Sequence, residues 1–541
     1  MPSRVALLDR RLKVATTSVT LAVRAAAAGF FFTATPALYC RLRHPTCNSA
    51  RRSMPITPQE WRSVRQILHD KLEFRALRPG QKEALEAVLQ GRDTLAVLPT
   101  GSGKSAIYQI AALMIPGPTV VVSPLIALQV DQVGAIRDCD LGKAALVNSL
   151  QRRTERERTF DALERNDLEF LLVAPEQLTN PDTLEKLQAA KPSLFVVDEA
   201  HCISEWGHSF RPDYLRLGSA IEALGRPVTL ALTATASPEV RSEIVERLGL
   251  RDPTVVVTGF DRPNIHLQVR CLTGETLKQR ELLQLVGGLE GSGIIYVSTR
   301  KRAETLAQAL TDAGVSSTAY HAGLKRDARQ ERQAAFMNGE IRTIVATCAF
   351  GMGIDKPDVR FVVHYDVSDS LDSYYQEVGR AGRDGEPAQA VLFFSERDLN
   401  LKRFFAGGGK LAESELQLLL DALTSEASPL TVAELQRRTG LTKSKVQRAM
   451  ARLEDRGVVD RVRSGVSLNR SSLRELSRHV GAALDAQEAL RARQSDRIAE
   501  MQAYARARGC RRASLLAHFG EALEGGCSGC DNCDHPLQGA A

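Results

Sequence analysis

The chain has 541 residues, of which 43% are hydrophobic and 25% charged, and its formal net charge is +7 at pH 7. A chain of this length is expected to form about three or four domains, and its hydrophobic content is ample for large cores. No uninterrupted apolar run reaches the length of a membrane span. The sequence therefore predicts a multi-domain globular protein and excludes one built on apolar transmembrane helices.

The positive charge is concentrated at the two ends of the chain. Residues 1–53 contain nine Lys or Arg and one Asp, and residues 401–541 contain 22 basic and 17 acidic side chains. Residues 54–400 contain 40 basic and 46 acidic side chains and are therefore mildly acidic. Contact with nucleic acid in this middle part would depend on a local groove, whereas the C-terminal part is basic as a whole.

Residues 1–53 do not have the pattern of a folded domain. They are rich in Arg, Ala and Thr and nearly free of acidic side chains, a composition that resembles an organelle transit peptide. Arg24 interrupts the apolar stretch 14–38, which argues against a secretory signal. We favour the alternative that Met54 is the natural start and that residues 1–53 are an unstructured extension or a mis-assigned start.

Residues 54–250 alternate short apolar runs with longer helical patterns. This alternation is typical of a parallel sheet wrapped by helices, and it predicts a first α/β lobe. The expected strands are residues 95–98, 119–122, 170–173, 194–197 and 229–232.

A phosphate-binding loop directly follows the first of these strands. Residues 99–105 read Pro-Thr-Gly-Ser-Gly-Lys-Ser, with Leu98 at the position where the usual pattern has Gly. Glycines let backbone N–H groups close around phosphate oxygens at the start of a helix, the Lys reaches the β/γ-phosphates, and the Ser hydroxyl ligates magnesium. The alternative is a Gly-rich turn with a stray Lys. The predicted ATP-binding residues are Thr100, Gly101, Ser102, Gly103, Lys104 and Ser105.

Two adjacent carboxylates, Asp198 and Glu199, follow the expected strand 194–197. At the C-terminal end of a parallel strand they would face the ligand crevice, where Asp198 can hold magnesium and Glu199 can activate a water. Trp206, Phe210 and Arg211 come soon afterwards, and aromatic and Arg side chains on a loop suit stacking on unpaired bases. The alternative is a strand end followed by a surface loop with buried aromatics.

A second series of strands is expected from residues 254–257 onwards. It contains no phosphate loop, but Arg380 and Arg383 lie three residues apart near its end. Two such arginines can stabilise a triphosphate across a cleft as arginine fingers; the alternative is a basic surface loop. The further expected strands are residues 293–297, 343–346, 360–364 and 390–394.

Residues 411–470 have a winged-helix pattern. A capping box at 431–434 starts a short helix, a second helix has an apolar face, and a hairpin is expected around 464–465. The apolar face consists of Val446, Ala449, Met450 and Leu453. A basic face opposite would contact a DNA groove or phosphates, unless it is only the solvated face of a protein-docking domain. It carries Lys445, Arg448, Arg452 and Arg456.

Four cysteines near the C-terminus, at positions 510, 527, 530 and 533, predict a closed tetrahedral zinc site. An iron–sulfur motif would require a further Cys at 537, where Leu537 stands. A helix over 486–509 would lead into this site, so the winged helix would be an insertion in a helical arm between the motor and the zinc module. The predicted ligands are Cys510, Cys527, Cys530 and Cys533.

The ordered motifs of the chain closely resemble those of the RecQ family of DNA helicases. The resemblance is continuous over residues 72–400 and returns at 486–535. The matching segments of the first half are 78–81, 123–128, 173–176, 198–214 and 233–235. Those of the second half are 320–324, 345–347, 351–357 and 374–383.

The resemblance implies further residue roles. An adenine-binding role falls on Phe74, Arg78 and Gln81, with Glu73 standing where the family has Gly before the aromatic. Further ATP contacts are implied for Asp355 and Gln376. The DNA contacts that the matched segments imply are at Ser123, His321 and Thr347.

The fold class expected is α/β, with two RecA-like parallel-sheet lobes followed by a winged-helix-like segment and a small zinc-binding module. The resemblance implies an ATP-dependent DNA helicase of the cytoplasm and nucleoid that travels 3′ to 5′, uses ATP, Mg²⁺ and Zn²⁺, and binds single-stranded and forked DNA. Single-strand-binding and repair proteins are candidate partners, and no membrane contact is expected. The alternatives are an RNA helicase and a DNA-binding or annealing factor with a vestigial motor. The expected domains are residues 54–250, 251–400, 401–485 and 486–541.

Overall fold

The computed structural model divides the chain into two compact units, Met1–Cys47 and Asn48–Ala541. The residues that it describes all lie in the second unit, so the expectations for residues 1–53 fall outside them. They are residues 55–204, 211–351, 356–407, 412–426, 428–455, 457–462, 465–469, 476–527 and 529–534.

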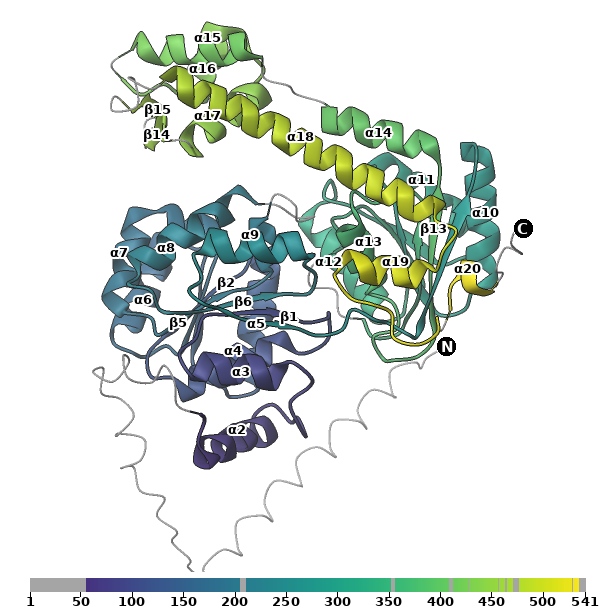
Figure 1. Ribbon diagram of the computed structural model, residues 1–541, viewed down its shortest axis with the longest axis horizontal. Coiled ribbons are helices and arrows are strands. Elements are labelled where there is room, and N and C mark those ends of the chain that lie inside the picture. Colours follow the sequence, from purple (N-terminus) through teal and green to yellow (C-terminus); the bar gives the residue numbers. More distant parts are fainter. Residues whose placement is uncertain are drawn as a thin grey trace, which may run out of the picture. The chain divides into compact units, whose positions relative to one another are not determined.

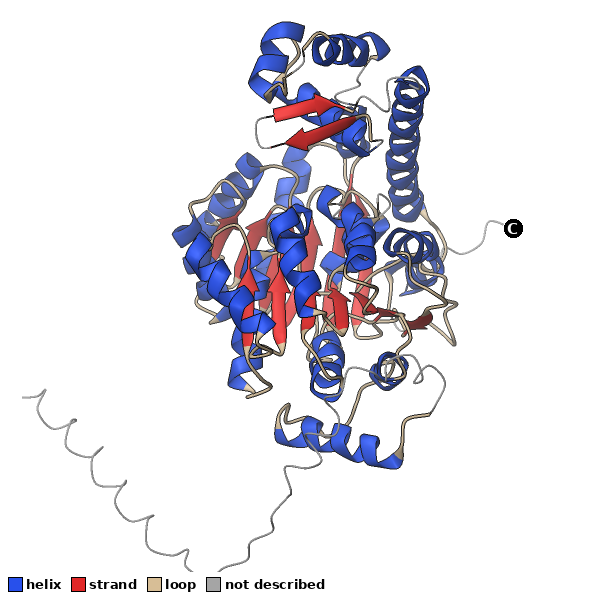
Figure 2. Cartoon of the chain, turned by 90° about the vertical axis from the view of Figure 1, so that its left-hand side faces the viewer, coloured by secondary structure: helices blue, strands red, loops and turns tan. Residues whose placement is uncertain are grey.

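The first lobe is built on a seven-stranded parallel sheet with the order β3-β4-β2-β5-β6-β1-β7 (Figure 1). Helices lie on both sides of the strands (Figure 2), and most of the central strands are therefore continuous apolar runs. The strands are β1 (Thr94–Val97), β2 (Thr119–Val122), β3 (Ala144–Val147), β4 (Phe170–Val173), β5 (Leu194–Val197), β6 (Val228–Thr233) and β7 (Thr254–Val257).

The helices of this lobe are α2 (Pro58–Asp70), α3 (Gln81–Leu89), α4 (Lys104–Met114), α5 (Ile126–Asp138), α6 (Arg153–Glu164), α7 (Pro181–Ala190), α8 (Leu217–Ala223) and α9 (Pro238–Leu248). Three of them, α2, α7 and α9, begin at a proline that follows a side-chain N-cap. Short 3₁₀ turns are η1 (Pro175–Thr179), η2 (Ala200–Ile203) and η3 (Pro212–Arg216).

The second lobe is a six-stranded parallel sheet with the order β10-β11-β9-β12-β13-β8. Its strands are β8 (Ile265–Cys271), β9 (Ser292–Tyr296), β10 (Ser317–Tyr320), β11 (Thr343–Ala346), β12 (Val359–His364) and β13 (Ala388–Phe394). Its helices are α10 (Glu275–Gly288), α11 (Arg300–Asp312), α12 (Arg326–Met337), α13 (Leu371–Val378) and α14 (Glu396–Gly407).

Nine of the ten strands expected from the sequence form in the expected sheet, and one forms in the other sheet. All nine expected strands outside residues 254–257 are present. Residues 254–257 form β7, which pairs in parallel with β1 and so belongs to the first sheet and does not open the second. An apolar run specifies a strand but not its neighbour, which explains this error. β3, β8 and β10 were not expected; each lies at the edge of its sheet and is incompletely buried.

The C-terminal part contains the expected winged-helix elements, which are α16 (Val432–Thr439), α17 (Lys443–Asp455), β14 (Val459–Val462) and β15 (Gly465–Leu468). A further helix, α15 (Glu413–Thr424), precedes them and was not predicted. The two strands pair antiparallel as a hairpin. The predicted capping box is present, since the Thr431 hydroxyl accepts from the Glu434 N–H and the Glu434 carboxylate accepts from the Thr431 N–H. The predicted apolar face, with Val446 and Leu453 fully buried, packs into one core with α15.

A long helix connects these elements to the C-terminal cysteines. It is α18 (Leu476–Arg506), followed by α19 (Arg511–His518) and α20 (Asp531–Asp534). α18 lies alongside α14 in Figure 1, and the Arg403 guanidinium donates to Gln502 Oε1 over 3.1 Å. α14 precedes the winged helix and α18 follows it, which is the element order that an insertion within a helical arm would have.

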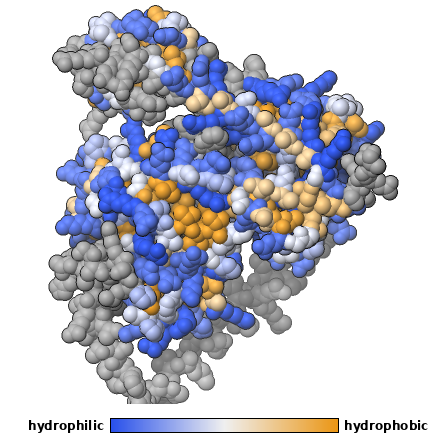
Figure 3. Space-filling view, in the orientation of Figure 1, coloured by the Kyte–Doolittle hydropathy of each residue, from blue (hydrophilic) through white to orange (hydrophobic). Residues whose placement is uncertain are grey.

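Hydrophobic residues gather in the middle of the face drawn in Figure 3, and the described helices around them present mostly hydrophilic surface. Among the described residues, no helix combines the length and apolarity that a bilayer crossing needs.

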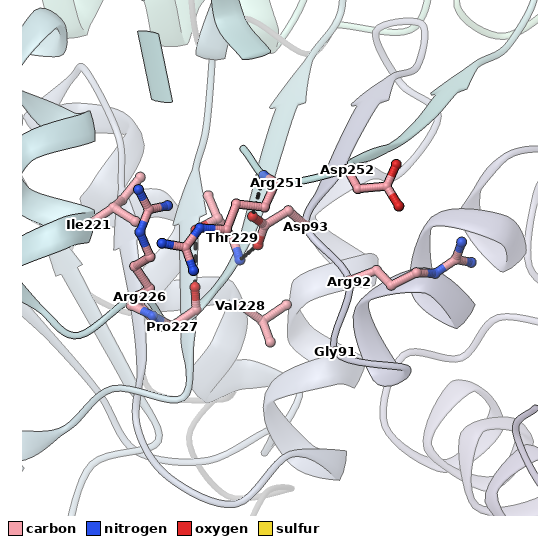
Figure 4. A pocket seen from close by; sticks show the side chains of 10 residues that line it. All are labelled: Gly91, Arg92, Asp93, Ile221, Arg226, Pro227, Val228, Thr229, Arg251 and Asp252. Carbon is pink, nitrogen blue, oxygen red and sulfur yellow. Dashed lines mark hydrogen bonds between the residues drawn. The ribbon is translucent and has the colours of Figure 1, made fainter. Parts of the chain in front are cut away.

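A cavity of about 240 Å³ opens at the edge of the first sheet where β1, β6 and β7 begin (Figure 4). Asp93 links β6 to the segment before β7, because its carboxylate accepts hydrogen bonds from the N–H groups of Thr229 (3.0 Å) and Arg251 (2.9 Å). In Figure 4 the Arg92 side chain points away from Arg226. The phosphate loop lies at the opposite, C-terminal edge of the same strands, so this cavity is separate from it.

Candidate ATP-binding and zinc sites

The predicted phosphate loop joins β1 to α4, which begins at Lys104. Gly101 and Gly103 have φ angles of +79° and +75°, values that glycine adopts without strain. The loop therefore turns tightly and presents the N-terminus of α4, where N–H groups and the helix dipole favour an anion. The Lys104 ammonium lies within the loop and donates to the carbonyls of Leu98 (3.2 Å) and Pro99 (3.4 Å).

Gln81 braces this loop from α3. Its side-chain N–H group donates to the carbonyls of Ser102 (2.7 Å) and Gly103 (2.9 Å), and its oxygen accepts from the Arg78 N–H. A Cβ on Gly103 would lie 2.8 Å from Gln81 Nε2, so a glycine is needed there. The Arg78 guanidinium contacts the Gly101 carbonyl. Phe74 is 40% exposed and is accessible for stacking. Of the three residues predicted to contact adenine, Arg78 and Gln81 therefore contact the phosphate loop, and Phe74 is exposed.

Asp198 and Glu199 lie at the same edge of the sheet, directly after β5. Asp198 is fixed by two hydrogen bonds, from Gln132 Nε2 (2.9 Å) and from the Glu199 N–H (3.0 Å). Glu199 has a φ of +50°, in the left-handed region that costs a side-chain-bearing residue about 1 kcal/mol or more. Strain of this kind persists where the surroundings fix the backbone. Here the Tyr214 hydroxyl donates to the Asp198 carbonyl over 3.0 Å.

The electrostatics of the pair suit a cation. Burial, and then the neighbouring Glu199 charge, raise the pKa of Asp198 to about 6, against the opposing effects of Gln132 and Lys104. Burial also raises the pKa of Glu199, whereas Lys104 and Arg380 lower it. Burial lowers the pKa of His201 to about 3, so His201 is neutral beside Glu199 and does not balance its charge. Glu199 Oε2 is buried without a hydrogen-bond partner among the described residues, which leaves it able to accept from a water.

Arg380 comes from the second lobe, two residues after α13 ends at Val378. It is only 5% exposed and lies beside Tyr296, and its charge acts on Glu199 of the first lobe. Its Nε has no hydrogen-bond partner among the described residues. Arg383 is half-buried, and its charge also acts on Tyr296. Gln376 is half-buried on α13 itself.

The residues predicted to contact DNA are distributed over both lobes. Ser123 is buried after β2, and the Arg211 guanidinium donates to the Pro124 carbonyl over 2.8 Å. In the second lobe, buried His321 lies 3.1 Å from a Glu304 carboxylate oxygen, and the Thr347 N–H donates to the Tyr320 carbonyl. Trp206, Phe210 and Asp355 lie outside the described residues.

The basic face of the winged helix is only partly available. The Lys445 ammonium pairs with Glu415 of α15. Arg448 lies at the surface. The side chain of Arg452 and the whole of Arg456 lie outside the described part of the chain. The pairing of Lys445 could not be read from helical spacing, because Glu415 lies 30 residues earlier.

Sequence reasoning did not single out Gln132, His201 or Tyr214. His201 ends the sequence Asp-Glu-Ala-His at residues 198–201. Its Nδ1 forms a 2.9 Å hydrogen bond with the Thr233 hydroxyl, which links this segment to the end of β6. Gln132 lies in the helix after the Ser123–Leu128 segment, and an amide there carries no sequence signal for a carboxylate partner.

The four predicted cysteines meet at the end of the chain. The sulfur atoms of Cys510, Cys527, Cys530 and Cys533 all lie within 4.8 Å of one another. Four bonds of about 2.3 Å to a tetrahedral zinc ion place sulfurs about 3.8 Å apart, so the set fits that ion. Cys510 caps α19, and its sulfur accepts from the Ala513 N–H over 3.4 Å.

Residues beside the cysteines bind the cluster to the second lobe. The Asp531 carboxylate accepts from the Val269 N–H over 2.9 Å, and the Leu267 N–H donates to the Gly529 carbonyl over 3.3 Å. Both partners lie on β8, the edge strand of the second sheet. The metal module thus covers an otherwise open sheet edge.

His518 gives the contact between the zinc module and α13 a pH dependence. Its Nε2 lies 3.0 Å from Asp372 Oδ2. Burial opposes its charged form, but the Asp372 hydrogen bond and the charges of Asp372, Glu500 and Glu239 outweigh burial and raise the pKa of His518. The stability that this pair contributes is therefore complete below the unfolded-state pKa of about 6.5 and is lost as pH rises through the raised folded value.

We expect His518→Gln to destabilise the protein by about 1.5–3 kcal/mol at pH 6, the range for hydrogen bonds to charged groups, and by less at pH 9. Chemical denaturation of both proteins at the two pH values measures this. His69→Gln, at an exposed position on α2, is the control. An equal difference at both pH values would contradict the prediction.

Four family models match the chain in succession. They are the DEAD/DEAH box helicase over residues 78–244, the helicase conserved C-terminal domain over 277–385, the IclR helix-turn-helix domain over 418–463 and the RecQ zinc-binding model over 468–534. The chain is 39% identical over 363 residues to the ATP-dependent DNA helicase RecQ of Synechocystis sp. (strain ATCC 27184 / PCC 6803 / Kazusa), covering 64% of this chain and 76% of that protein. The chain belongs to the RecQ family.

A second RecQ relative, the ATP-dependent DNA helicase of Pasteurella multocida (strain Pm70), is 43% identical over 333 residues. The match covers 61% of this chain and 52% of the relative, so the chain spans about half of that RecQ protein's length. Among solved structures, the fold is similar to that of the DUF1998 helicase MrfA bound to DNA, with a TM-score of 0.54 and 18% identity over 77% of this chain and 60% of that one. In this RecQ-family chain the helix-turn-helix match precedes the zinc-binding match.

Proposed function

We propose that this RecQ-family chain is an ATP-dependent DNA helicase that moves 3′ to 5′ along single-stranded DNA and unwinds duplexes in recombination and repair. The observation that carries the proposal is the convergence of one ammonium, two buried carboxylates and one guanidinium from three separate segments. These groups belong to Lys104, Asp198, Glu199 and Arg380. The similarity to the RecQ relatives supports DNA as the nucleic acid.

The proposed chemistry is hydrolysis of the γ-phosphate of ATP. Lys104 and the N-terminus of α4 bind the phosphates, and Ser105 and Asp198 would hold Mg²⁺, which when bound neutralises charge on the phosphate oxygens. Glu199 would accept a hydrogen bond from the attacking water through Oε2, which has no hydrogen-bond partner among the described residues and lies 3.3 Å from His201 Nδ1. Arg380, with Arg383, stabilises the charge that develops on the transferred group. Because Arg380 belongs to the other lobe, hydrolysis and release would change the attraction between the lobes and so drive movement along DNA.

Two comparisons test this function. ATP turnover is measured with single-stranded DNA and with RNA of the same sequence, and strand separation is measured on duplexes with a 3′ or a 5′ single-stranded tail. We expect stimulation by DNA and unwinding of the 3′-tailed duplex. Stimulation by RNA alone would favour the RNA helicase, and DNA binding or annealing without turnover would favour a vestigial motor. We propose a cytoplasmic, nucleoid-associated location, with single-strand-binding and repair proteins as partners.

We expect Trp206→Ala and Phe210→Ala to reduce DNA-stimulated turnover strongly while basal turnover stays near that of the unaltered protein. These residues follow Asp198 by eight and twelve positions, so a strand stacked on them would act on the segment that carries both carboxylates. Each stacked base is worth about 1–3 kcal/mol, so binding should weaken only moderately. Both rates and the melting temperature are measured on one preparation. A parallel fall of both rates with a lower melting temperature would identify the two aromatics as core residues.

A further inference from the structure

The segment between the two lobes is held from several sides. Residues 258–264 connect β7 of the first sheet to β8 of the second. Phe260 is 1% exposed, and its ring stacks on Phe519 of the zinc module at 4.4 Å between centroids and meets Tyr375 of α13 edge-on at 5.8 Å. The Phe260 N–H donates to Glu521 Oε2 over 2.8 Å. The segment is therefore fixed in place immediately before Arg262.

Arg262 reaches from this segment to the turn that carries Arg380. Its guanidinium donates to the carbonyls of Gly379 (3.2 Å), Ala381 (2.8 Å) and Gly382 (2.9 Å), which lie on both sides of Arg380. The turn follows the end of α13, where carbonyl groups lack partners within the helix. Arg262 thus adds side-chain hydrogen bonds to this turn, whose Gly382 carbonyl also accepts from the Gly385 N–H over 3.1 Å.

A neighbouring side chain continues the same contact. Asn264 Nδ2 donates to the carbonyls of Gly382 (2.8 Å) and Glu386 (2.9 Å). Gly382 has a φ of +56°, and a Cβ there would lie 2.4 Å from Asn264 Nδ2. The close approach of the interlobe segment to the turn therefore requires glycine at this position.

We propose that Arg262 is a positioning residue for Arg380: by holding the carbonyls on both sides of it, Arg262 sets the direction in which the Arg380 guanidinium faces Glu199. The inference rests on the proposed ATP hydrolysis. Arg380 Nε has no hydrogen-bond partner among the described residues, although the guanidinium lies beside Tyr296, so the backbone of the turn and Tyr296 are the two features that can fix its placement. Burial lowers the pKa of Arg262, in agreement with a guanidinium enclosed by the turn. A planar guanidinium can reach three carbonyls at once, whereas a Lys ammonium cannot match that fork.

Arg262→Gln is expected to lower kcat for ATP about 10–100-fold and to change KM for ATP less than about threefold, because the phosphate loop is untouched. An arginine finger is worth about 10³–10⁵ in rate, and a misplacement of about 1 Å can cost about 10²-fold. Arg262→Lys should lose less activity than Arg262→Gln. Turnover is measured at saturating single-stranded DNA, together with the melting temperature of each variant.

Arg342→Gln is the matched control. The Arg342 guanidinium also bonds to three backbone carbonyls of the second lobe, those of Gly291, Val286 and Leu289, but at a site away from the turn. We expect this variant to lose melting temperature to a similar degree and to keep kcat within about twofold. If Arg262→Gln and Arg342→Gln lower kcat alike, Arg262 is structural and the proposal is wrong.

A double substitution separates positioning from an independent effect. Arg262→Gln combined with Arg380→Ala should be no slower than Arg380→Ala alone, because a positioning residue has nothing left to position. Losses that multiply would overturn the proposal. If Arg262→Gln does not fold, Arg262→Lys serves in the same cycle, and an unchanged kcat in that variant also overturns it. If the wild-type protein shows no ATP turnover, the proposed function itself is wrong. If the wild-type protein is active and Arg380→Ala lowers turnover but Arg262→Gln does not, only the positioning role of Arg262 is wrong.

Discussion

Lys104→Ala should abolish ATP hydrolysis and strand separation, with turnover falling at least about 10³-fold, while binding of single-stranded DNA stays largely intact. The Lys104 ammonium lies inside the phosphate loop, at the N-terminus of α4, where it would neutralise the β- and γ-phosphates. It also lowers the pKa values of both buried carboxylates, so its loss would leave Asp198 and Glu199 less readily ionised. DNA contact is proposed for other segments and does not depend on this side chain.

Steady-state ATP turnover and fluorescence anisotropy with a labelled single strand measure the two properties separately. Lys186→Ala is the control, because it removes an ammonium from the same lobe at α7, where Lys186 lies 5.1 Å from the centre of the Phe160 ring. We expect that variant to keep turnover within about twofold. Normal turnover in Lys104→Ala would show that the loop is not the phosphate site.

The second large effect is expected at the cysteine cluster. Cys530→Ser should remove a bound zinc ion, taking the metal content from about one per chain to near zero, and should make the protein aggregate. Zinc binding contributes about 10–16 kcal/mol in isolated zinc-finger peptides, so loss of one of four thiolates removes much of the folding energy of the module. Cys530 is fully buried, and its neighbours Gly529 and Asp531 bond to β8. Unfolding of the module would therefore expose an edge strand, the usual template for association between chains.

Elemental analysis of the purified protein, thermal unfolding with and without a chelator, and light scattering check this prediction. Cys271→Ser is the matched control, since Cys271 is exposed at the end of β8 and lies outside the cluster. It should keep the metal and the melting temperature. Iron in place of zinc, or an active protein free of metal, would contradict the assignment.

The sequence by itself determined the elements whose chemistry is local. The phosphate loop, the Asp198-Glu199 pair and the four cysteines depend on residues close together in the chain, and the structure places each set as the spacing predicted. The winged-helix core was also predictable, because an apolar face repeats within a single helix and a capping box spans only three residues.

Only the tertiary structure decided the contacts between distant segments. An apolar run such as residues 254–257 forms a strand in either sheet, and its pairing with β1 depends on the chain that intervenes. Gln132, which bonds Asp198, lies 66 residues from it along the chain, and Glu415, which pairs with Lys445, lies 30 residues away. Arg262, which bonds the turn around Arg380, lies about 118 residues before it. Hydrogen bonds and ion pairs act over a few ångströms in space, so spacing in the sequence reveals them only within one helix, turn or strand pair. The candidate ATP-binding and zinc-binding groups could therefore be named from the sequence, whereas the side chains that hold them in place required the fold.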